Sequence, residues 1–275
     1  MMFMPVLFFA EVSNISLTTY ILVPLCSLWS GFWIHAYSCF FHEAAHFNIY
    51  KNKKINDMIS NIIFTPFLGM LVKHYRLSHW EHHKHLGTDN DTEISYLTPL
   101  SLLNLIQIIT GVFHVKIILR YFRNYNSVSE AKHKSGSKIF LFTLLLTVIV
   151  QLLISYIMFI HVSTASAVSW LVAYFILFPM ISNIRQTLEH RPSDSQKLVS
   201  KKNFKAVNRI FGTDFFSRYF GAAGFNRHLL HHYDPLISYT NFNELENFLK
   251  DTPANKEISR MRATYLGILN NLLER

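Results

Sequence analysis

The chain has few cysteines and few charged residues. Of its 275 residues, two are cysteines (Cys26 and Cys39) and 16% are charged, against about 25% in a typical soluble domain. Two cysteines in apolar surroundings exclude a disulfide scaffold and a four-cysteine zinc module. Half of the residues are hydrophobic, which excludes an intrinsically disordered chain. Lysine and arginine do not occur before residue 51, so the apolar start lacks the basic region of a cleaved secretory signal.

Long uncharged runs predict membrane-spanning helices. Residues 16–41 contain no Asp, Glu, Lys or Arg, and these 26 residues are long enough to cross the hydrocarbon core. A second uncharged run divides into 139–160 and 165–182, joined by four residues, which predicts a helical hairpin. Residues 58–72 and 99–115 are short for a span and predict re-entrant or interfacial segments. The sequence thus predicts three to four transmembrane helices with interfacial helices, in a single domain over residues 1–275.

The positive charge follows this pattern. The formal net charge is +9, which favours either nucleic acid or an anionic membrane surface as a partner. Lysines and arginines flank the apolar segments on one implied face, whereas the loop of the predicted hairpin has none. By the positive-inside rule, the basic face is cytoplasmic. An anionic membrane surface therefore accounts for the excess of positive charge, and we expect membrane lipids and no nucleic acid as partners.

The last part of the chain has an ordinary globular composition. Thr252-Pro253 is a good helix start, and apolar residues recur on one face from Ile258 to Leu272. This pattern predicts one closing amphipathic helix over residues 252–272.

Histidine is the residue in excess, with 15 in the chain. Nine of them fall in four short places: His42 and His46; His79, His82 and His83; His190; and His228, His231 and His232. Spacings of three and four residues place imidazoles on one face of a helix. At this histidine frequency roughly 0.05 copies of HxxHH are expected by chance, and the chain has two. The nine histidines are therefore candidate metal ligands.

Imidazole ligands without thiolates suit iron, copper, zinc or nickel. Nine ligands are too many for one tetrahedral zinc and suit two metals with four or five imidazoles each. Neutral imidazoles leave such a pair strongly positive, so carboxylates are expected around it. The candidates are Glu43, Glu81, Asp89, Asp91, Glu93, Glu189 and Asp234, and His85 is an alternative ligand. A shared site requires all four histidine places to lie on the basic side of the membrane.

The three boxes resemble those of the membrane fatty acid desaturase and hydroxylase superfamily. The superfamily pattern is HxxxH, then HxxHH, then a late HxxHH. Its surroundings also match, over roughly residues 15–245: Tyr75-Arg76 before His79 with Asp89 and Asp91 after it, Arg185 and Glu189 before His190, and Asn226 through Pro235 and Asn241. The resemblance implies an all-α membrane protein with a cytosolic helical cap, a centre of two iron ions held by the nine histidines, dioxygen as co-substrate and an acyl-lipid substrate.

The sequence departs from that pattern in places. Box one begins His42-Glu43 where many relatives have His-Asp, and one clear span precedes it where relatives often have two. Gln186 stands where some relatives carry an asparagine that holds the metal through water. The sequence shows no fused haem-binding domain, so a separate electron donor, ferredoxin-like or cytochrome-like, is expected together with its reductase.

The expected function is the introduction of a double bond into a fatty acyl chain of a lipid. A hydroxylase or ketolase of the same superfamily, acting on a lipid, sterol or carotenoid, is the main alternative. Residues 42–46 also form the HExxH pattern of zinc proteases, with Glu43 as general base. That alternative lacks an Asp-Gly element for the third ligand and leaves seven clustered histidines unexplained. A non-enzymatic metal carrier would place its ligands inside the spans.

Overall fold

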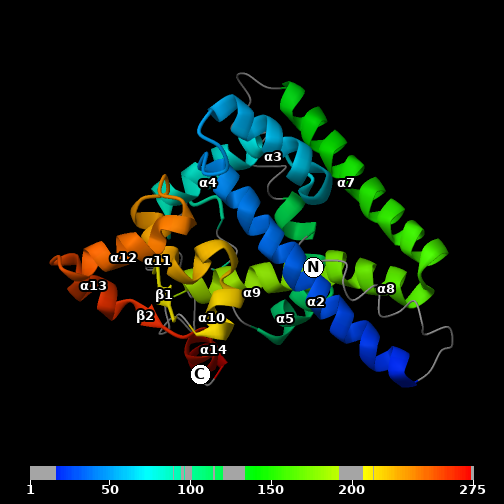
Figure 1. Ribbon diagram of the computed structural model, residues 1–275. Coiled ribbons are helices and arrows are strands. Elements are labelled where there is room, and N and C mark those ends of the chain that lie inside the picture. The colour runs from blue at the N-terminus through cyan, green and yellow to red at the C-terminus, as the bar shows by residue number, and fades with distance from the viewer. Residues whose placement is uncertain are drawn as a thin grey trace. The chain divides into compact units, whose positions relative to one another are not determined.

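The computed structural model describes residues 17–88, 90–93, 96, 101–113, 115–119, 134–191, 207–212 and 214–273 (Figure 1). The described chain is mostly helical, in agreement with the expected fold class. Its contacts divide it into two compact units. The first, here the apolar unit, takes its residues from Met1–Ser38, Ile59–Leu71 and Leu105–Ser182. The second, here the histidine unit, takes them from Cys39–Met58, Val72–Asn104 and Asn183–Arg275.

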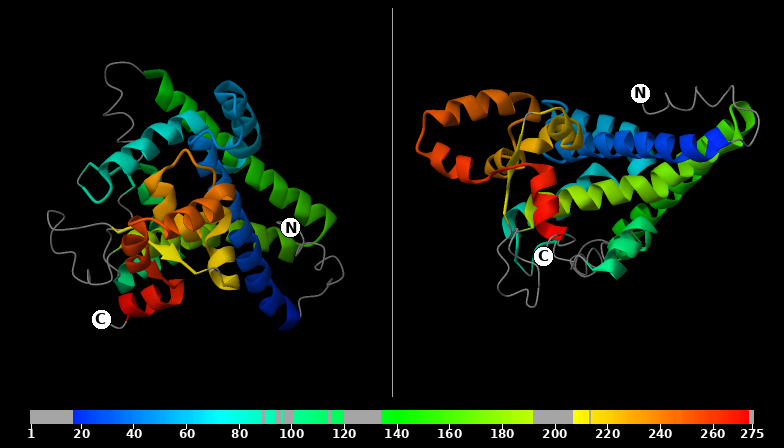
Figure 2. Two further views of the ribbon diagram at one scale, coloured as in Figure 1. Left: turned by 60° about the vertical axis from the view of Figure 1, so that its left-hand side comes forward. Right: turned by 90° about the horizontal axis from the view of Figure 1, so that it is seen from below.

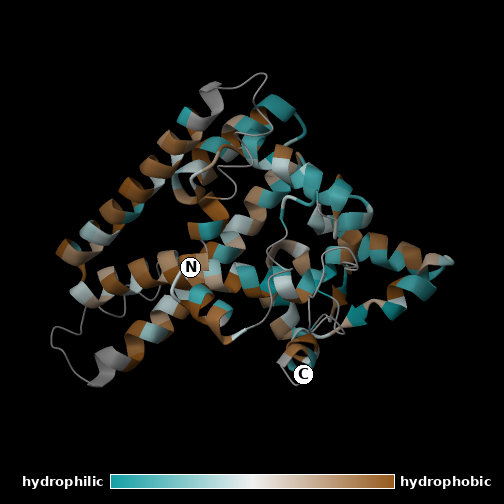
Figure 3. Cartoon of the chain, turned by 180° about the vertical axis from the view of Figure 1, so that it is seen from behind, coloured by the Kyte–Doolittle hydropathy of each residue, from teal (hydrophilic) through white to brown (hydrophobic). Residues whose placement is uncertain are grey.

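The apolar unit contains the predicted helical hairpin. Helix α7 (Lys134–His161) is followed after two residues by α8 (Thr164–Val172), the π-turn η3 (Ala173–Leu177) and α9 (Phe178–His190), which together form one helical stretch. Ser163 starts that stretch, since its hydroxyl accepts from the Ser166 amide at 3.1 Å. Figure 3 shows α7 and α8 as predominantly hydrophobic. The predicted run 139–160 lies within α7, and the run 165–182 lies within the stretch from α8 to α9.

By length and composition, two helical stretches among the described residues could cross a membrane. They are Lys138–His161 and Thr164–His190, and the number becomes three if the bent pair α3 (Lys53–Leu68) and α4 (Val72–His85) forms one broken span. Helix α2 (Leu17–Ala45) has 29 residues and covers the predicted first span from residue 17 on; residue 16 lies outside the described part of the chain. The crossing of the membrane by α2 stays a prediction. Helix α5 (Leu102–Ile109) has eight residues, too few to span. Residues 99, 100 and 114 of the predicted interfacial segment lie outside the described part of the chain.

Side chains on α7 separate into an apolar outer face and a polar inner one. The outer face exposes Phe142, Leu145 and Ile149, each more than half accessible, an arrangement suited to lipid rather than to water. On the inner face, buried Thr143 donates to the Gly69 carbonyl at 2.8 Å, and buried Thr147 donates to the Thr65 carbonyl at 2.9 Å. Hydrogen bonds between helices are a common way for membrane helices to associate.

A close contact fixes α2 against the helical stretch that follows α8. Buried Gly31 lies so near to η3 that a Cβ atom there would come within 2.8 Å of the Leu177 Cβ and 3.2 Å of the Ala173 carbonyl. Beside this contact, Trp170 is buried and donates from its indole nitrogen to Gln151 at 3.1 Å. Small residues at such crossings allow two helix backbones to approach closely.

The histidine unit is built from short elements. Besides α4 and the ends of α2, α3 and α9, it contains β1 (Ile210–Phe211), α10 (Phe215–Phe220), η5 (Ala222–Arg227), α11 (His228–Tyr233), η6 (Tyr239–Asn241), α12 (Phe242–Lys250), α13 (Ala254–Arg260), β2 (Arg262–Ala263) and α14 (Tyr265–Leu273). The two strands pair in parallel, Ile210 with Arg262 and Phe211 with Ala263. Helices α12 and α13 fold back on each other (Figure 2).

The single closing helix predicted over residues 252–272 is wrong. The segment forms α13 and α14, and β2 separates them. The Ile210 amide donates to the Met261 carbonyl at 3.0 Å, so pairing with β1 replaces helical hydrogen bonds at this point. The Thr264 hydroxyl then accepts from the Gly267 amide at 3.0 Å and starts α14. Most residues of the predicted apolar face still point inward, in two separate clusters around Tyr265 and Ile258, whereas Met261 is exposed.

A substitution at Gly31 tests the helix contact in the apolar unit. We expect Gly31→Val to lower the free energy of unfolding by about 1–3 kcal/mol, because its branched side chain overlaps η3. Thermal unfolding of the detergent-solubilised protein measures this. Leu28→Val, at a half-exposed position of the same helix, is the matched control, and equal midpoints for the two variants would contradict the assigned contact.

Candidate metal centre

The histidine unit brings all nine predicted histidines together in two groups. The first histidine group consists of His42, His46, His79, His83 and His231, and the second contains His82, His190 and His232. In each group the candidate ligand atoms lie within 4.8 Å of one another, close enough for one metal ion. His228 joins the second group, since its Nε2 lies 2.9 Å from the Nε2 of His190 and 3.0 Å from that of His232.

Each of the two HxxHH boxes contributes histidines to both groups. In box two on α4, His79 and His83 belong to the first group and His82 to the second. In box three on α11, the outer pair belongs to the second group and His231 to the first. With 3.6 residues per turn, positions i+3 and i+4 fall on opposite sides of position i. Each box can therefore face both groups at once.

The remaining ligands come from two helix ends. His42 lies in the last turn of α2 and His46 directly after it, and both are buried. His190 is the last residue of α9 and is also buried. Box one therefore contributes only to the first group, and His190 only to the second.

The ring nitrogens that face the groups carry lone pairs. Nδ1 of His79 and Nδ1 of His82 each lie 2.8 Å from a carboxylate oxygen, of Glu93 and Asp91 respectively. Nδ1 of His190 lies 3.3 Å from the Val207 carbonyl oxygen. Because carboxylate and carbonyl oxygens accept, these Nδ1 atoms carry the proton, and Nε2 is left with a lone pair. This tautomer is the one a metal-binding histidine needs when it coordinates through Nε2.

Several buried nitrogens in the groups lack a hydrogen-bond partner among the described residues. They are both ring nitrogens of His42 and of His46, and Nδ1 of His228 and of His231. A buried polar atom without a partner costs about 1–3 kcal/mol. The Nε2 of His83, moreover, lies 3.0 Å from both the Nε2 of His79 and that of His231, although one nitrogen has a single lone pair or a single proton. The residues therefore fit metal ions better than a network of imidazole hydrogen bonds.

Burial lowers the pKa of eight of the nine imidazoles and keeps them neutral. It lowers the pKa of His46 to about 3, with a further contribution from His83. Burial likewise holds the pKa values of His228, His231 and His232 well below 6.5, and neighbouring imidazoles add to the effect. Neutral imidazole is the form that binds a metal, so these eight ligands need not lose a proton at neutral pH. His82 is the exception: burial lowers its pKa, but Glu93, Asp91 and Glu189 together raise it above 6.5.

Four of the seven candidate carboxylates approach the histidines, and three of them, Asp91, Glu93 and Glu189, belong to a wider network. Asp91 is fully buried and also accepts from the Gly87 amide at 3.1 Å and from the Tyr96 hydroxyl. Glu93 accepts from the amide group of Gln186 at 3.2 Å. Glu189 lies 3.9 Å from Nδ1 of His228 and accepts from Arg185 at 2.9 Å. The Gln186 side chain thus holds the Glu93 carboxylate, which in turn orients His79.

The other candidates have different surroundings. Glu81 pairs with His85 at 3.3 Å, and neither belongs to a histidine group. Asp234 accepts from the Leu236 amide within a turn. Asp89 lies outside the described residues.

Glu43 joins box one to the loop that follows box three. Its Oε2 accepts from the Asn48 side chain at 3.2 Å and from the Tyr239 amide at 3.3 Å. Its other oxygen is 3.7 Å from Nδ1 of His42. A zinc protease needs this carboxylate as a general base for water, but here it connects the Asn48 side chain with the Tyr239 backbone.

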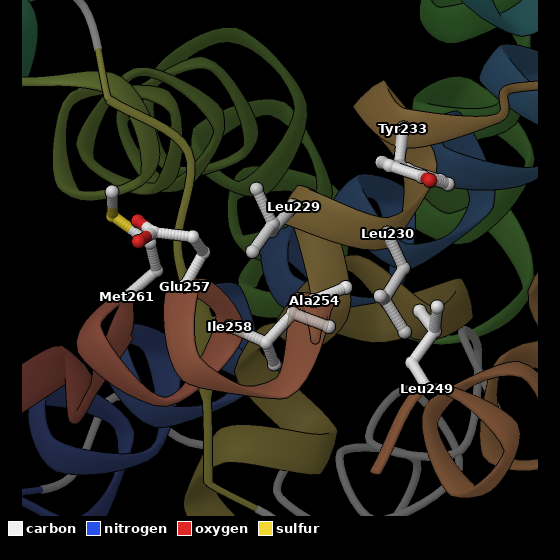
Figure 4. A pocket seen from close by; sticks show the side chains of 8 residues that line it. All are labelled: Leu229, Leu230, Tyr233, Leu249, Ala254, Glu257, Ile258 and Met261. Carbon is white, nitrogen blue, oxygen red and sulfur yellow. The ribbon is translucent and has the colours of Figure 1, made fainter. Parts of the chain in front are cut away.

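The sequence pattern identified the histidines but not all of the groups that hold them through hydrogen bonds. The Val207 carbonyl and the Tyr96 hydroxyl were missed, because a backbone carbonyl has no signature in the sequence and one tyrosine among 13 does not stand out. A small apolar pocket has a volume of about 150 Å³. Its lining includes Leu229, Leu230, Leu249 and Ile258 (Figure 4). None of the nine histidines lines it.

Residues 18–263 match the family model described as "Fatty acid desaturase". The match spans 246 of the 275 residues, about nine tenths of the chain, and contains every one of the nine histidines. No curated protein and no solved structure matches the chain.

The Asp91 carboxylate offers a test of the second group. We expect Asp91→Asn to lower the affinity of the purified protein for Fe(II) about 10–100-fold, because His82 loses its charged partner. Competition with a coloured chelator measures the affinity. Asp234→Asn, which changes a carboxylate that accepts from a backbone amide, is the control, and an unchanged affinity in Asp91→Asn would remove Asp91 from the support of the metal.

Proposed function

The chain belongs to the fatty acid desaturase family, and we propose that it is a membrane di-iron oxidoreductase that uses dioxygen to introduce a double bond into a fatty acyl chain of a lipid. Family membership makes it a membrane oxidoreductase that acts on fatty acyl chains. Our proposal goes beyond family membership in three respects: the identity of the metal, desaturation as the reaction, and the orientation in the membrane.

The observation that carries the proposal is the pair of adjacent histidine groups. The first group offers five imidazoles, and the second offers three together with His228. Ligand sets of four or five neutral nitrogen atoms suit two iron ions that each keep a position open for oxygen or water. His42, His46, His79, His83 and His231 would hold one ion, and His82, His190, His228 and His232 the other.

Two bound iron ions supply the oxidising power, with dioxygen, for removal of hydrogen from an unactivated methylene. The substrate loses two hydrogen atoms from adjacent carbons and gains a carbon–carbon double bond. With two electrons from the donor and two protons, those hydrogens reduce one dioxygen to two water molecules.

The residues of this chain hold and shield the reacting centre. Asp91 and Glu93 fix the ring orientation of His82 and His79, which keeps both Nε2 atoms directed at the metal positions. Phe225 packs on His42 with ring centroids 4.5 Å apart, and Tyr75 stacks on His79 at 5.1 Å. Such apolar surroundings limit the access of water.

The proposal also covers location and partners. The two apolar helical stretches support insertion into a membrane, and the distribution of lysine and arginine favours a cytoplasmic position for the histidine boxes. The electrons would come from a separate ferredoxin-like or cytochrome-like donor and its reductase, and the substrate would be an acyl lipid.

Metal content tests the di-iron centre. We expect about two iron atoms per chain in the purified protein, since nine imidazoles fill two sites. We expect His231→Ala and His82→Ala, one from each group, to abolish product formation while leaving membrane insertion unchanged.

His85→Ala is the control, because His85 lies on the same helix as His82 but outside both groups. One zinc and no iron in the wild-type protein would refute the di-iron centre, and full activity in either group variant would remove that residue from the ligand set.

Lipid analysis distinguishes desaturation from its alternatives. We expect acyl chains two mass units lighter after expression in a host that lacks the activity, because desaturation removes two hydrogen atoms. Mass spectrometry of total lipids with a His231→Ala control measures this. A gain of sixteen mass units would instead show the hydroxylase alternative, and oxidation of a carotenoid with unchanged acyl chains would show the ketolase.

A further inference from the structure

Two arginines of the histidine unit bind the carbonyl groups at helix ends that carry candidate ligands. Arg76 contacts the end of α2 and Arg209 the end of α9. The last carbonyls of a helix lack partners within the helix and carry a partial negative charge. A guanidinium group, with five donors in a rigid plane, can bind several of them at once.

Arg76 fastens box one to box two. Its Nε donates to the Ala45 carbonyl at 2.7 Å and its Nη2 to the Ala44 carbonyl at 3.1 Å. Asp57 holds the same guanidinium through two contacts, at 2.5 and 3.0 Å. Arg76 belongs to α4, three residues before His79, whereas Ala45 directly precedes His46. The side chain therefore fixes the positions of two parts of the first group relative to each other.

The backbone where α2 ends needs such support. Phe47 has a φ of +64°, a left-handed conformation that costs energy for a residue other than glycine. The guanidinium of Arg76 lies 3.7 Å from the centroid of the Phe47 ring, so a cation–π contact adds to the hydrogen bonds. Arg76 thus holds the backbone directly before His46 and the side chain of the residue directly after it.

Arg209 does the same for His190 and box three. Its Nη1 donates to the Leu188 carbonyl at 2.7 Å and its Nη2 to the Arg191 carbonyl at 2.5 Å, on either side of His190. Arg209 is buried. Its own carbonyl accepts from the Leu229 amide at 3.0 Å, directly after His228. These contacts fix two parts of the second group relative to each other.

We infer that Arg76 and Arg209 are positioning residues, each of which sets one of the two metal sites: Arg76 the site of the first histidine group and Arg209 that of the second. The inference rests on the proposed di-iron function. Lysine at either position keeps the positive charge at the helix end but lacks the planar set of donors. A charge effect alone would therefore survive the change to lysine, and a positioning effect would not.

Metal titration of the purified full chain tests the inference. Arg76→Lys and Arg209→Lys are each titrated with Fe(II) and, separately, with Co(II), whose absorption spectrum reports the ligand geometry. We expect each variant to keep one metal at wild-type affinity and to bind the other about 10–100-fold more weakly, the range found for groups that orient ligands. The spectrum of Arg76→Lys at limiting metal should match that of His231→Ala, and the spectrum of Arg209→Lys that of His82→Ala.

Controls separate this inference from the proposed function. Arg260→Lys, at an exposed arginine of α13, should bind two metals as the wild type does. Wild-type protein that binds no iron would refute the di-iron function, whereas two undisturbed sites in both arginine variants would refute the inference alone. Equal weakening of both sites in each variant would also overturn it.

If Arg76→Lys does not fold, Asp57→Asn serves in its place, because it leaves Arg76 intact but removes its charged partner. It should weaken the first site alone, and a weakened second site or two unchanged sites would contradict the assignment.

Discussion

The structure of the histidine unit depends on one kind of unfavourable interaction: buried, neutral imidazole nitrogens face one another at about hydrogen-bond distance. Four pairs of Nε2 atoms lie 2.9–3.0 Å apart, and in those tautomers that bind metals their lone pairs converge. Such atoms repel each other and are removed from water, so the polypeptide must hold them in place. The carboxylates behind His79 and His82, and the arginines at two helix ends, supply that restraint. A metal ion turns the same convergence of lone pairs into a favourable interaction.

The two boxes with the pattern HxxHH are linked in a way that their spacing explains. In each box, positions i and i+4 point towards one group and position i+3 towards the other. Box two gives two ligands to the first group and one to the second, and box three gives one to the first and two to the second. His82 therefore joins ligands supplied mainly by box three, and His231 joins ligands supplied mainly by boxes one and two. Rotation of α4 or α11 would disturb both groups, whereas displacement of the end of α2 or of α9 would disturb one.

The sequence predicted the parts that depend on residue type and spacing. The helical hairpin followed from a long uncharged run, and the nine histidines from a spacing rare by chance. The prediction of one closing helix was wrong because β1, 52 residues earlier in the chain, pairs with residues 262 and 263, and long-range pairing overrides helical periodicity. Val207 and the backbone partners of Arg76 and Arg209 could not be predicted, because backbone carbonyls are present at every position and their use depends on tertiary packing. Gln186 was flagged only as a departure, and its contact with Glu93 gives it a structural role.

Helix ends are a sensible place for ligands of this kind. A histidine in the middle of a helix is held by hydrogen bonds on both sides, whereas His46 and His190 lie where the regular hydrogen bonds stop. The free carbonyls at these ends let other segments attach: Ala44 accepts from both Arg76 and Asn56, and the His190 carbonyl accepts from the Val207 amide at 3.0 Å. A ligand at a helix end can thus be joined to other elements through its own carbonyl, as His190 is, or through a carbonyl close to it in the chain, as His46 is. Because hydrogen bonds from guanidinium groups are strong and directional, Arg76 and Arg209 stabilise helix ends that would otherwise fray.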